Sequence, residues 1–167
     1  MLLRDANSSD FPQILMLNEE SVHFLSPLTP ERLEHLHKEA AYHRVLEEEG
    51  KVIGFLLAFR EGCAYSSPNY RWFSQKFDKF IYIDRVVVSL SKQGRGIGPS
   101  LYADLFAFAV RTDAGRVTCE FDIDPPNEIS RRFHERHGFK EVGTQSVASS
   151  RKQVSLQAVL LPLANAV

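Results

Sequence analysis

The sequence predicts a mixed fold of the α/β (α+β) class, in which strands and helices alternate along the chain. Three observations support this prediction. Residues 52–59 form a nearly continuous apolar run, which is typical of a central strand covered on both faces. Apolar residues recur at helical spacing over residues 11–20. A β-branched run at residues 86–88 leads into three glycines at alternate positions and then into a second apolar stripe of helical period.

The predicted elements follow the order β-α-α-β-β-β-α-β-α-β-β. They cover residues 1–4, 11–20, 31–39, 41–47, 51–60, 80–89, 97–112, 117–123, 127–137, 139–147 and 153–161. Polar residues 8–10 supply N-cap candidates for the first helix. Leu33 and Leu36 give the second helix an inward face, and Glu48-Glu49-Gly50 joins the next two strands into a hairpin.

The second half of the chain contains one long irregular stretch. Residues 61–79 mix aromatic residues with Ser, Pro and Asn, and we expect a loop there. After the glycines, Leu101 and Leu105 begin the helical stripe. Asn127 can cap the last helix, and Gly138 can end it in a left-handed conformation.

Length and composition bound the class of protein. A chain of 167 residues predicts one domain, over residues 1–167. The net charge of −1 argues against a broad basic surface for nucleic acid or an anionic membrane. Cys63 and Cys119 are too few for a disulfide framework or a metal site, so we expect a reduced, cytoplasmic setting and no metal. The N-terminus turns polar too early for a signal peptide, and no apolar run approaches the ~20 residues that span a bilayer.

The glycine-rich turn is the clearest functional signal. Its amides, together with the positive end of the following helix dipole, form a site suited to a polyphosphate, and Lys92 and Arg95 add positive charge. A P-loop would need a lysine after the last glycine, where Pro99 stands instead. The dinucleotide fingerprint lacks its third glycine here. The alternative is an ordinary turn between a strand and a helix.

The turn resembles a known signature. Residues 93–98 read Gln-Gly-Arg-Gly-Ile-Gly and match the Q/R-x-x-G-x-G/A motif of the GCN5-related N-acetyltransferase (GNAT) superfamily. Residues 127–139 are similar to the family's second motif, a helix that starts at an Asn and ends in Gly-Phe. The resemblance covers roughly residues 1–161. It implies a central, predominantly antiparallel sheet of six to seven strands, with splayed central strands and four flanking helices.

The resemblance also implies the cofactor, acetyl-coenzyme A, and the residues around it. In the family the loop amides hold the pyrophosphate, and backbone groups of the preceding strand hold the pantetheine arm. Asn127 lies near that arm or is a plain N-cap, and the Ser100 hydroxyl can add to the phosphate contacts. The cofactor-binding positions are thus Val86, Val87, Val88, Gln93, Gly94, Arg95, Gly96, Ile97, Gly98, Ser100 and Asn127.

Two residues are candidates for proton transfer. Asp84 resembles the acidic residue that some family members use to take the proton of the amine. The alternative is an ion pair, although Arg85, its neighbour on the strand, should point to the opposite face. His134 stands where the family commonly has a tyrosine that protonates the departing thiolate. A histidine can act there as an acid or as a base, or it packs on the helix surface beside coenzyme A.

The acceptor site is expected from three regions. Glu20 and His23 end the first helix, Tyr82 shares a strand face with Asp84, and Asp122 lies on the adjacent strand. Tyr82 is also explained as a half-buried aromatic of the sheet. The carboxylates of Glu20 and Asp122, together with the aromatic residues of 61–79, suggest that the acceptor is a small cationic amine. The alternative is that the carboxylates are simply exposed and that the aromatic residues of the loop serve packing.

The resulting hypothesis is direct acetyl transfer from acetyl-coenzyme A to a primary amine of a small molecule or peptide, without an acyl-enzyme. The alternatives are another acyl-coenzyme A as donor and a non-catalytic coenzyme A-binding module. An edge strand near the C-terminus could pair two chains. The sequence does not identify the acceptor.

Overall fold

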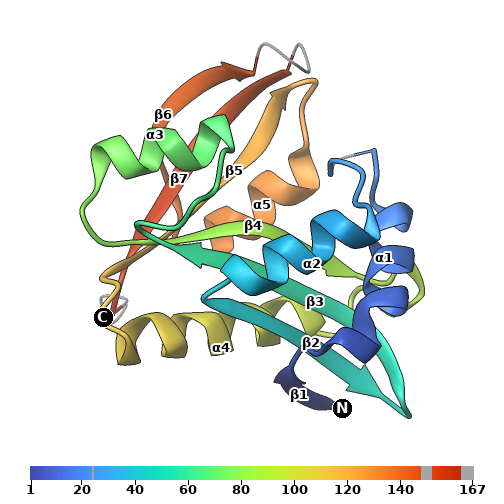
Figure 1. Cartoon of the computed structure of the whole chain (residues 1–167). Coiled ribbons are helices and arrows are strands. Elements are labelled where there is room, and N and C mark those ends of the chain that lie inside the picture. Colours follow the sequence, from blue (N-terminus) through green and yellow to red (C-terminus); the bar gives the residue numbers. More distant parts are fainter. Residues whose placement is uncertain (24, 148–151, 163–167) are drawn as a thin grey trace. The chain divides into compact units, whose positions relative to one another are not determined.

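The computed structural model describes residues 1–23, 25–147 and 152–162 (Figure 1). Its strands form one seven-stranded sheet in the order β1-β2-β3-β4-β5-β7-β6. Their bounds are β1 (Leu2–Asp5), β2 (Tyr42–Glu48), β3 (Lys51–Arg60), β4 (Ile81–Val88), β5 (Arg116–Asp124), β6 (Lys140–Val147) and β7 (Lys152–Leu160). The mixed fold class is confirmed.

Five α-helices and two 3-10 turns accompany the strands in the described residues. The helices are α1 (Phe11–Glu20), α2 (Pro30–Glu39), α3 (Pro68–Lys76), α4 (Ile97–Arg111) and α5 (Glu128–Arg136), and the turns are η1 (Ser8–Asp10) and η2 (Leu90–Lys92). Strand pairs β1–β2, β2–β3, β5–β7 and β6–β7 are antiparallel, and β4–β5 is parallel at Ile81–Val117 and Tyr82–Thr118. The predominantly antiparallel sheet is therefore confirmed.

The chain divides into two compact units, Met1–Phe59 with Ile83–Ala107, and Arg60–Tyr82 with Phe108–Val167. Each unit buries hydrophobic residues of its own. A single domain over residues 1–167 stays a prediction.

In the first unit, helices cover both faces of the strands. Val45 and Phe55 are register partners on β2 and β3, and both belong to a buried cluster that includes residues of α1 and α2. Gly54 faces the other side, where an added Cβ would lie 3.0 Å from the Val87 carbonyl oxygen and 3.1 Å from a methyl group of Ile97. The glycine therefore lets α4 approach β3 closely.

Local sequence signals explain the start of α2 and the β2–β3 hairpin in this unit. The Thr29 hydroxyl accepts the Arg32 N–H at 3.2 Å and caps α2, whose first residue is a proline. Leu33 and Leu36 are buried, as predicted. The β2–β3 hairpin turns at Glu49 and Gly50, with φ of 53° and 76°, as expected of a tight hairpin turn with two left-handed residues.

In the second unit, α3 and α5 cover opposite faces of β5, β7 and β6. Trp72 of α3 packs on Gly143 so closely that an added Cβ would lie 2.6 Å from the indole. His134 of α5 stacks on Phe121 of β5, with ring centroids 5.8 Å apart. Gly143 is in register with Leu156 of β7, which is in register with Glu120 of β5. Phe121 follows Glu120 on β5, so its side chain points to the opposite face of the sheet from Gly143.

The prediction of a loop over residues 61–79 is wrong, because α3 occupies its centre. The Ser67 hydroxyl accepts the Tyr70 N–H at 3.4 Å, and Pro68 is the first helical residue. Tyr70 and Phe73 are buried on one face of this nine-residue helix. The helix is too short for a clear apolar period, and its aromatic packing stabilises it. The described residues thus contain five α-helices where four were expected.

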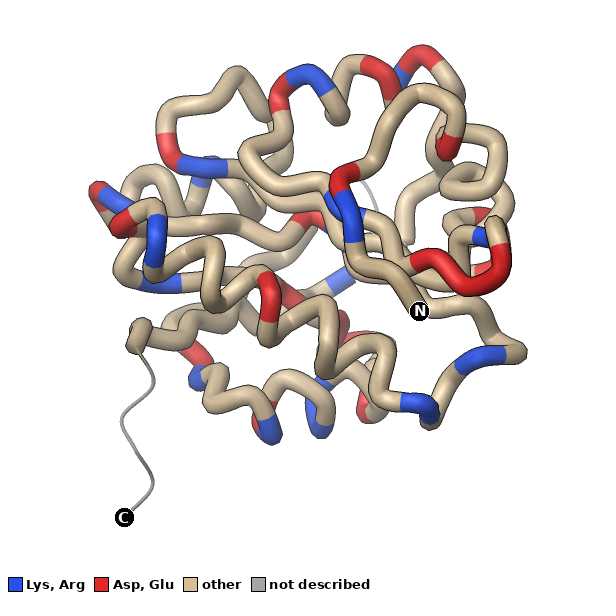
Figure 2. The backbone as a smooth tube through the Cα atoms, turned by 90° about the horizontal axis from the view of Figure 1, so that it is seen from below, with Lys and Arg blue, Asp and Glu red and all other residues tan. Residues whose placement is uncertain are grey.

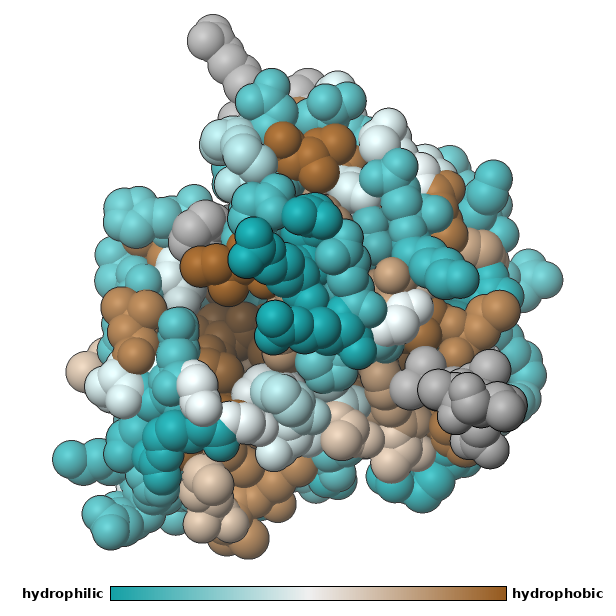
Figure 3. All heavy atoms as spheres, turned by 180° about the vertical axis from the view of Figure 1, so that it is seen from behind, coloured by the Kyte–Doolittle hydropathy of each residue, from teal (hydrophilic) through white to brown (hydrophobic). Residues whose placement is uncertain are grey.

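The described surface is mixed in charge and polarity. Basic and acidic positions are interspersed along the chain in Figure 2, in agreement with the net charge of −1. On the face drawn in Figure 3, hydrophobic residues lie in patches between hydrophilic ones. Among the described residues, no helix is both long and apolar enough to cross a membrane.

Candidate functional site

The glycine loop lies between η2 and α4 in the first unit. Gly94 and Gly96 have φ of 76° and 78°, in the left-handed region that favours glycine. An added Cβ at either position would meet nothing within 4 Å, so the conformation and not a lack of space requires glycine. Gln93 to Gly96 are exposed, whereas Ile97 is buried and anchors the start of α4.

The first turn of α4 presents backbone donors. Helix geometry provides no carbonyl partner for the N–H groups of Gly96, Ile97 and Gly98, and Pro99 has no N–H to satisfy. The Ser100 hydroxyl donates to the Gly96 carbonyl oxygen at 2.9 Å, so its proton is already engaged within the helix. The loop therefore offers backbone N–H groups and a helix N-terminus to an anion.

The two cations of the loop are held by a residue that the sequence analysis did not single out. Lys92 Nζ lies 2.7 Å from one Glu48 carboxylate oxygen, and Arg95 Nη2 lies 2.8 Å from the other. Hydrogen bonds from Arg95, the larger effect, and from Lys92 lower the pKa of Glu48 to about 2. Glu48 ends β2, more than 40 positions before both cations (44 and 47), so no local sequence pattern points to it.

Asp84 and Arg85 form a buried ion pair, although the sequence predicted that they point apart. Arg85 Nε donates to Asp84 Oδ2 at 2.6 Å, and both side chains are 5% exposed. Strand alternation fixes only the direction of Cβ, and the long arginine side chain bends back to its neighbour. Arg85 Nη1 also donates to Asn18 Oδ1 at 2.8 Å, and Asn18 Nδ2 donates to the Ser26 carbonyl oxygen at 3.2 Å. This network joins β4 to α1 and to the segment that follows α1.

The strand residues expected to hold the pantetheine arm precede the loop directly. Val87 is buried, and Val86 and Val88 are half-buried. Val87 belongs to the buried cluster of the first unit. That a cofactor contacts the backbone of this strand stays a prediction.

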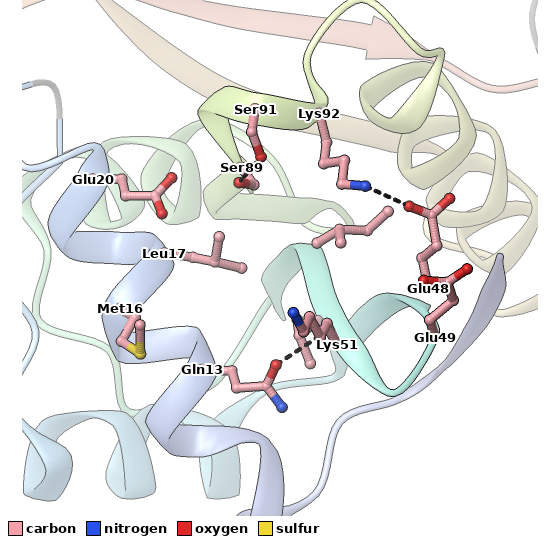
Figure 4. A pocket seen from close by; sticks show the side chains of 12 residues that line it. Gln13, Met16, Leu17, Glu20, Glu48, Glu49, Lys51, Ser89, Ser91 and Lys92 are labelled. Atoms are coloured by element: carbon pink, nitrogen blue, oxygen red, sulfur yellow. Dashed lines mark hydrogen bonds and ion pairs between the residues drawn. The ribbon is translucent and has the colours of Figure 1, made fainter.

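Of the two acceptor candidates in the first unit, Glu20 lines a cavity. Glu20 Oε2 accepts the Leu90 N–H at 3.2 Å, and His23 is exposed in the turn after α1. A cavity of about 350 Å³ lies between α1, the β2–β3 hairpin and residues 89–92 (Figure 4). Glu20 and Glu48 both line this cavity. Residues 90–92 lie between the two carboxylates: Glu20 accepts the Leu90 N–H, and Glu48 accepts from Lys92 Nζ.

In the second unit, His134 is buried, so its interpretation as a helix-surface residue is wrong. Its ring is packed against Phe121 and Phe139, with centroids at 5.8 and 5.2 Å. Nδ1 lies 2.7 Å from the Ser130 carbonyl oxygen, and this contact requires the proton on Nδ1. Burial lowers the pKa of His134 to about 4. The ring is therefore neutral at pH 7, with its lone pair on Nε2.

Tyr82, Asp122 and Asn127 also lie in the second unit. Tyr82 is 1% exposed, so it is fully buried and not half-buried as expected. Its hydroxyl donates to Glu120 Oε1 at 2.9 Å, which favours the interpretation as a sheet aromatic. Asp122 Oδ2 accepts from Lys152 Nζ at 2.8 Å. Asn127 caps α5 as predicted, since its Oδ1 accepts the Ser130 N–H at 3.1 Å.

The predicted site residues thus fall into two groups. The glycine loop, Asp84, Glu20 and His23 belong to the first unit, and Tyr82, Asp122, Asn127 and His134 to the second. Within the described residues, no three His, Cys, Asp or Glu side chains are grouped as metal ligands.

Comparison with known proteins identifies the family of the chain. Residues 3–139 match the family described as Acetyltransferase (GNAT) family, and the chain belongs to that family. A phosphinothricin N-acetyltransferase from Streptomyces coelicolor is 46% identical over 59 residues. That match covers 35% of this chain and about one third (33%) of the length of that enzyme.

Solved structures share the fold. Ribosomal-protein-alanine N-acetyltransferase from Brucella melitensis has a TM-score of 0.72 at 21% identity, with 96% of this chain and 100% of that chain covered. The protein yncA from Salmonella typhimurium, solved with its cofactor acetyl-coenzyme A, has a TM-score of 0.73 at 19% identity, with 100% of this chain and 97% of that chain covered. At these identities the likeness concerns the fold.

Proposed function

We propose that the chain is an N-acetyltransferase that moves an acetyl group from acetyl-coenzyme A directly to a primary amine. The observation that carries the proposal is the glycine loop, in which left-handed Gly94 and Gly96 lead into α4. The first-turn amides of this helix have no carbonyl partner within the helix. Membership of the GNAT family and the acetyl-coenzyme A bound by yncA support the choice of donor. Amides at a helix N-terminus suit a diphosphate.

In this proposal the backbone around the loop holds the cofactor. Residues 93–98 bind the diphosphate, and the backbone of Val86 to Val88 holds the pantetheine arm. Asn127 adds a polar contact from the start of α5. The reaction joins the amine nitrogen to the acetyl carbon and breaks the carbon–sulfur bond, so the amine loses a proton and the thiolate gains one.

We assign His134 the role of a proton acceptor. Its Nδ1 proton is engaged by Ser130 and its ring is neutral at pH 7, which suits a base better than an acid for the thiolate. Asp84 is engaged by Arg85, so we assign it a positioning role through Arg85. A His134→Phe variant that leaves the pH–rate profile unchanged would reduce His134 to packing, and an Asp84→Asn variant with normal turnover would remove Asp84 from the site.

The acceptor is proposed to be a primary amine, with Glu20 and His23 of the first unit and Asp122 of the second unit as its candidate contacts. The partial match to a phosphinothricin N-acetyltransferase makes small amino acids a first choice for the substrate panel. A cytoplasmic location, a homodimer and the absence of a metal requirement stay predictions.

The decisive experiment is a thiol-release assay with purified protein and acetyl-coenzyme A. The panel contains amino acids, phosphinothricin, polyamines, aminoglycosides and peptide N-termini. We expect one class to release free thiol, and Gly96→Asp to abolish release. Gly115→Asp is the matched control, because Gly115 also has a positive φ (73°) and open space but lies outside the loop. Tight acetyl-coenzyme A binding with no release from any amine would favour a non-catalytic module.

A further inference from the structure

We propose that Glu48 is a positioning residue of the cofactor site, which holds Lys92 and Arg95 in place at the glycine loop for the diphosphate of acetyl-coenzyme A. This inference rests on the proposed function. It adds a residue from the β2–β3 hairpin, outside both sequence motifs, to the parts that determine cofactor affinity.

The geometry is that of one carboxylate shared by two cations. Arg95 approaches Glu48 through both terminal nitrogens, with Nη2 at 2.8 Å from Oε1 and Nη1 at 3.1 Å from Oε2. Lys92 Nζ lies 2.7 Å from Oε2 (Figure 4). The Glu48 side chain is 20% exposed, less than either cation at 34% and 43%. These contacts keep Glu48 ionised across the physiological range, because they lower its pKa to about 2.

The backbone before the loop is fixed by other contacts. The Ser89 N–H donates to the Ile53 carbonyl oxygen at 2.9 Å, and the Lys92 N–H donates to the Ser89 carbonyl oxygen at 2.9 Å. Glu20 holds the Leu90 N–H from the side of α1. Within the described residues, the Arg95 side chain has hydrogen bonds to Glu48 alone. Removing Glu48 is therefore expected to release the two side chains and to leave the backbone of η2 in place.

The cations keep donors for a ligand while they contact Glu48. A guanidinium has five N–H donors and an ammonium three, and Glu48 uses only part of each set. Two long side chains that are already ordered lose less conformational entropy when the diphosphate binds. Loss of the negative charge of Glu48 would also reduce repulsion of the diphosphate, but this effect acts across exposed, well-screened surroundings and is the smaller of the two.

The test is calorimetry with acetyl-coenzyme A on five proteins: the wild type, two single variants, a double variant and a triple variant. Glu48→Gln keeps the shape and removes the charge, and we expect its Kd to rise about tenfold. Glu49→Gln is the matched control, an exposed neighbour in the same hairpin with no ion pair among the described residues, and its Kd should equal that of the wild type. In a Lys92→Met/Arg95→Met background, adding Glu48→Gln should change Kd no further, because Glu48 acts through these two cations.

The outcomes separate this inference from the proposed function. If the wild type does not bind acetyl-coenzyme A, the proposed function fails and the inference fails with it. If the wild type binds and Glu48→Gln binds equally or more tightly, or still weakens binding without the cations, only the inference is overturned. Should Glu48→Gln not fold, as judged by circular dichroism, Glu48→Asp takes its place. It keeps the charge on a shorter side chain, and an unchanged Kd for it would also overturn the inference.

Discussion

Replacing His134 by phenylalanine should make the protein less sensitive to acid. In the folded protein, burial lowers the pKa of His134 from 6.5 to about 4. Between these values the unfolded chain binds a proton that the folded chain does not bind. Acid therefore favours the unfolded state in this window, and the free energy of unfolding rises with pH until about 6.5.

The magnitude follows from the size of the pKa shift. One pKa unit corresponds to about 1.4 kcal/mol, so lowering the pH from 7 to 5 costs about 2 kcal/mol through His134. Below a folded-state pKa of about 4 the loss levels off near 3 kcal/mol. Burial lowers the pKa of His43 in the first unit to about 4 as well, so His43 adds a loss of similar size. The variant removes one of these two contributions.

Urea unfolding at pH 7 and at pH 5 measures the effect. When the pH is lowered from 7 to 5, His134 and His43 together should lower the free energy of unfolding of the wild type by about 4 kcal/mol. In His134→Phe only His43 contributes, and the loss should be about 2 kcal/mol. His43→Phe is the companion variant that keeps the His134 contribution. An equal acid loss in the wild type and in His134→Phe would refute the burial argument, and with it the neutral ring on which the role as proton acceptor depends.

Three further predictions concern the loop and the core. Gly96→Ala should weaken acetyl-coenzyme A binding about tenfold in calorimetry, because its φ of 78° costs an L-residue about 1–2 kcal/mol; Gly115→Ala should leave Kd unchanged. Arg85→Met should lower the free energy of unfolding by about 3–5 kcal/mol, because it leaves Asp84 buried without its ion pair, and a loss under 1 kcal/mol in urea would contradict this. Gly54→Val should destabilise the protein by about 1–3 kcal/mol through contact with the Val87 carbonyl; an unchanged melting temperature would show that α4 can move away.

Most of the fold was predicted from sequence signals within a few neighbouring residues. The hairpin at Glu49 and Gly50, the Asn127 cap of α5 and the glycine loop all depend on residues within a few positions of one another. Each was predicted from turn or cap chemistry, and each is present in the structure. The exception is α3, whose nine residues are too few for a clear apolar period.

The site was predicted less completely, because its interactions join distant residues. Glu48 holds Arg95 across 47 positions, and no pattern of neighbouring residues indicates such a pair. The burial of His134 depends on Phe121 of β5, so the helix motif alone left its environment open. Strand alternation argued against the Asp84–Arg85 pair, but it describes Cβ directions and not the reach of an arginine.

The most direct test of the account is an NMR titration of the isotope-labelled protein with acetyl-coenzyme A. We predict that the backbone amide signals of Gly94, Gly96, Ile97 and Gly98 shift together and saturate, since these N–H groups are proposed to bind the diphosphate. Saturable shifts confined to other parts of the chain, or no shifts at all, would contradict the central claim.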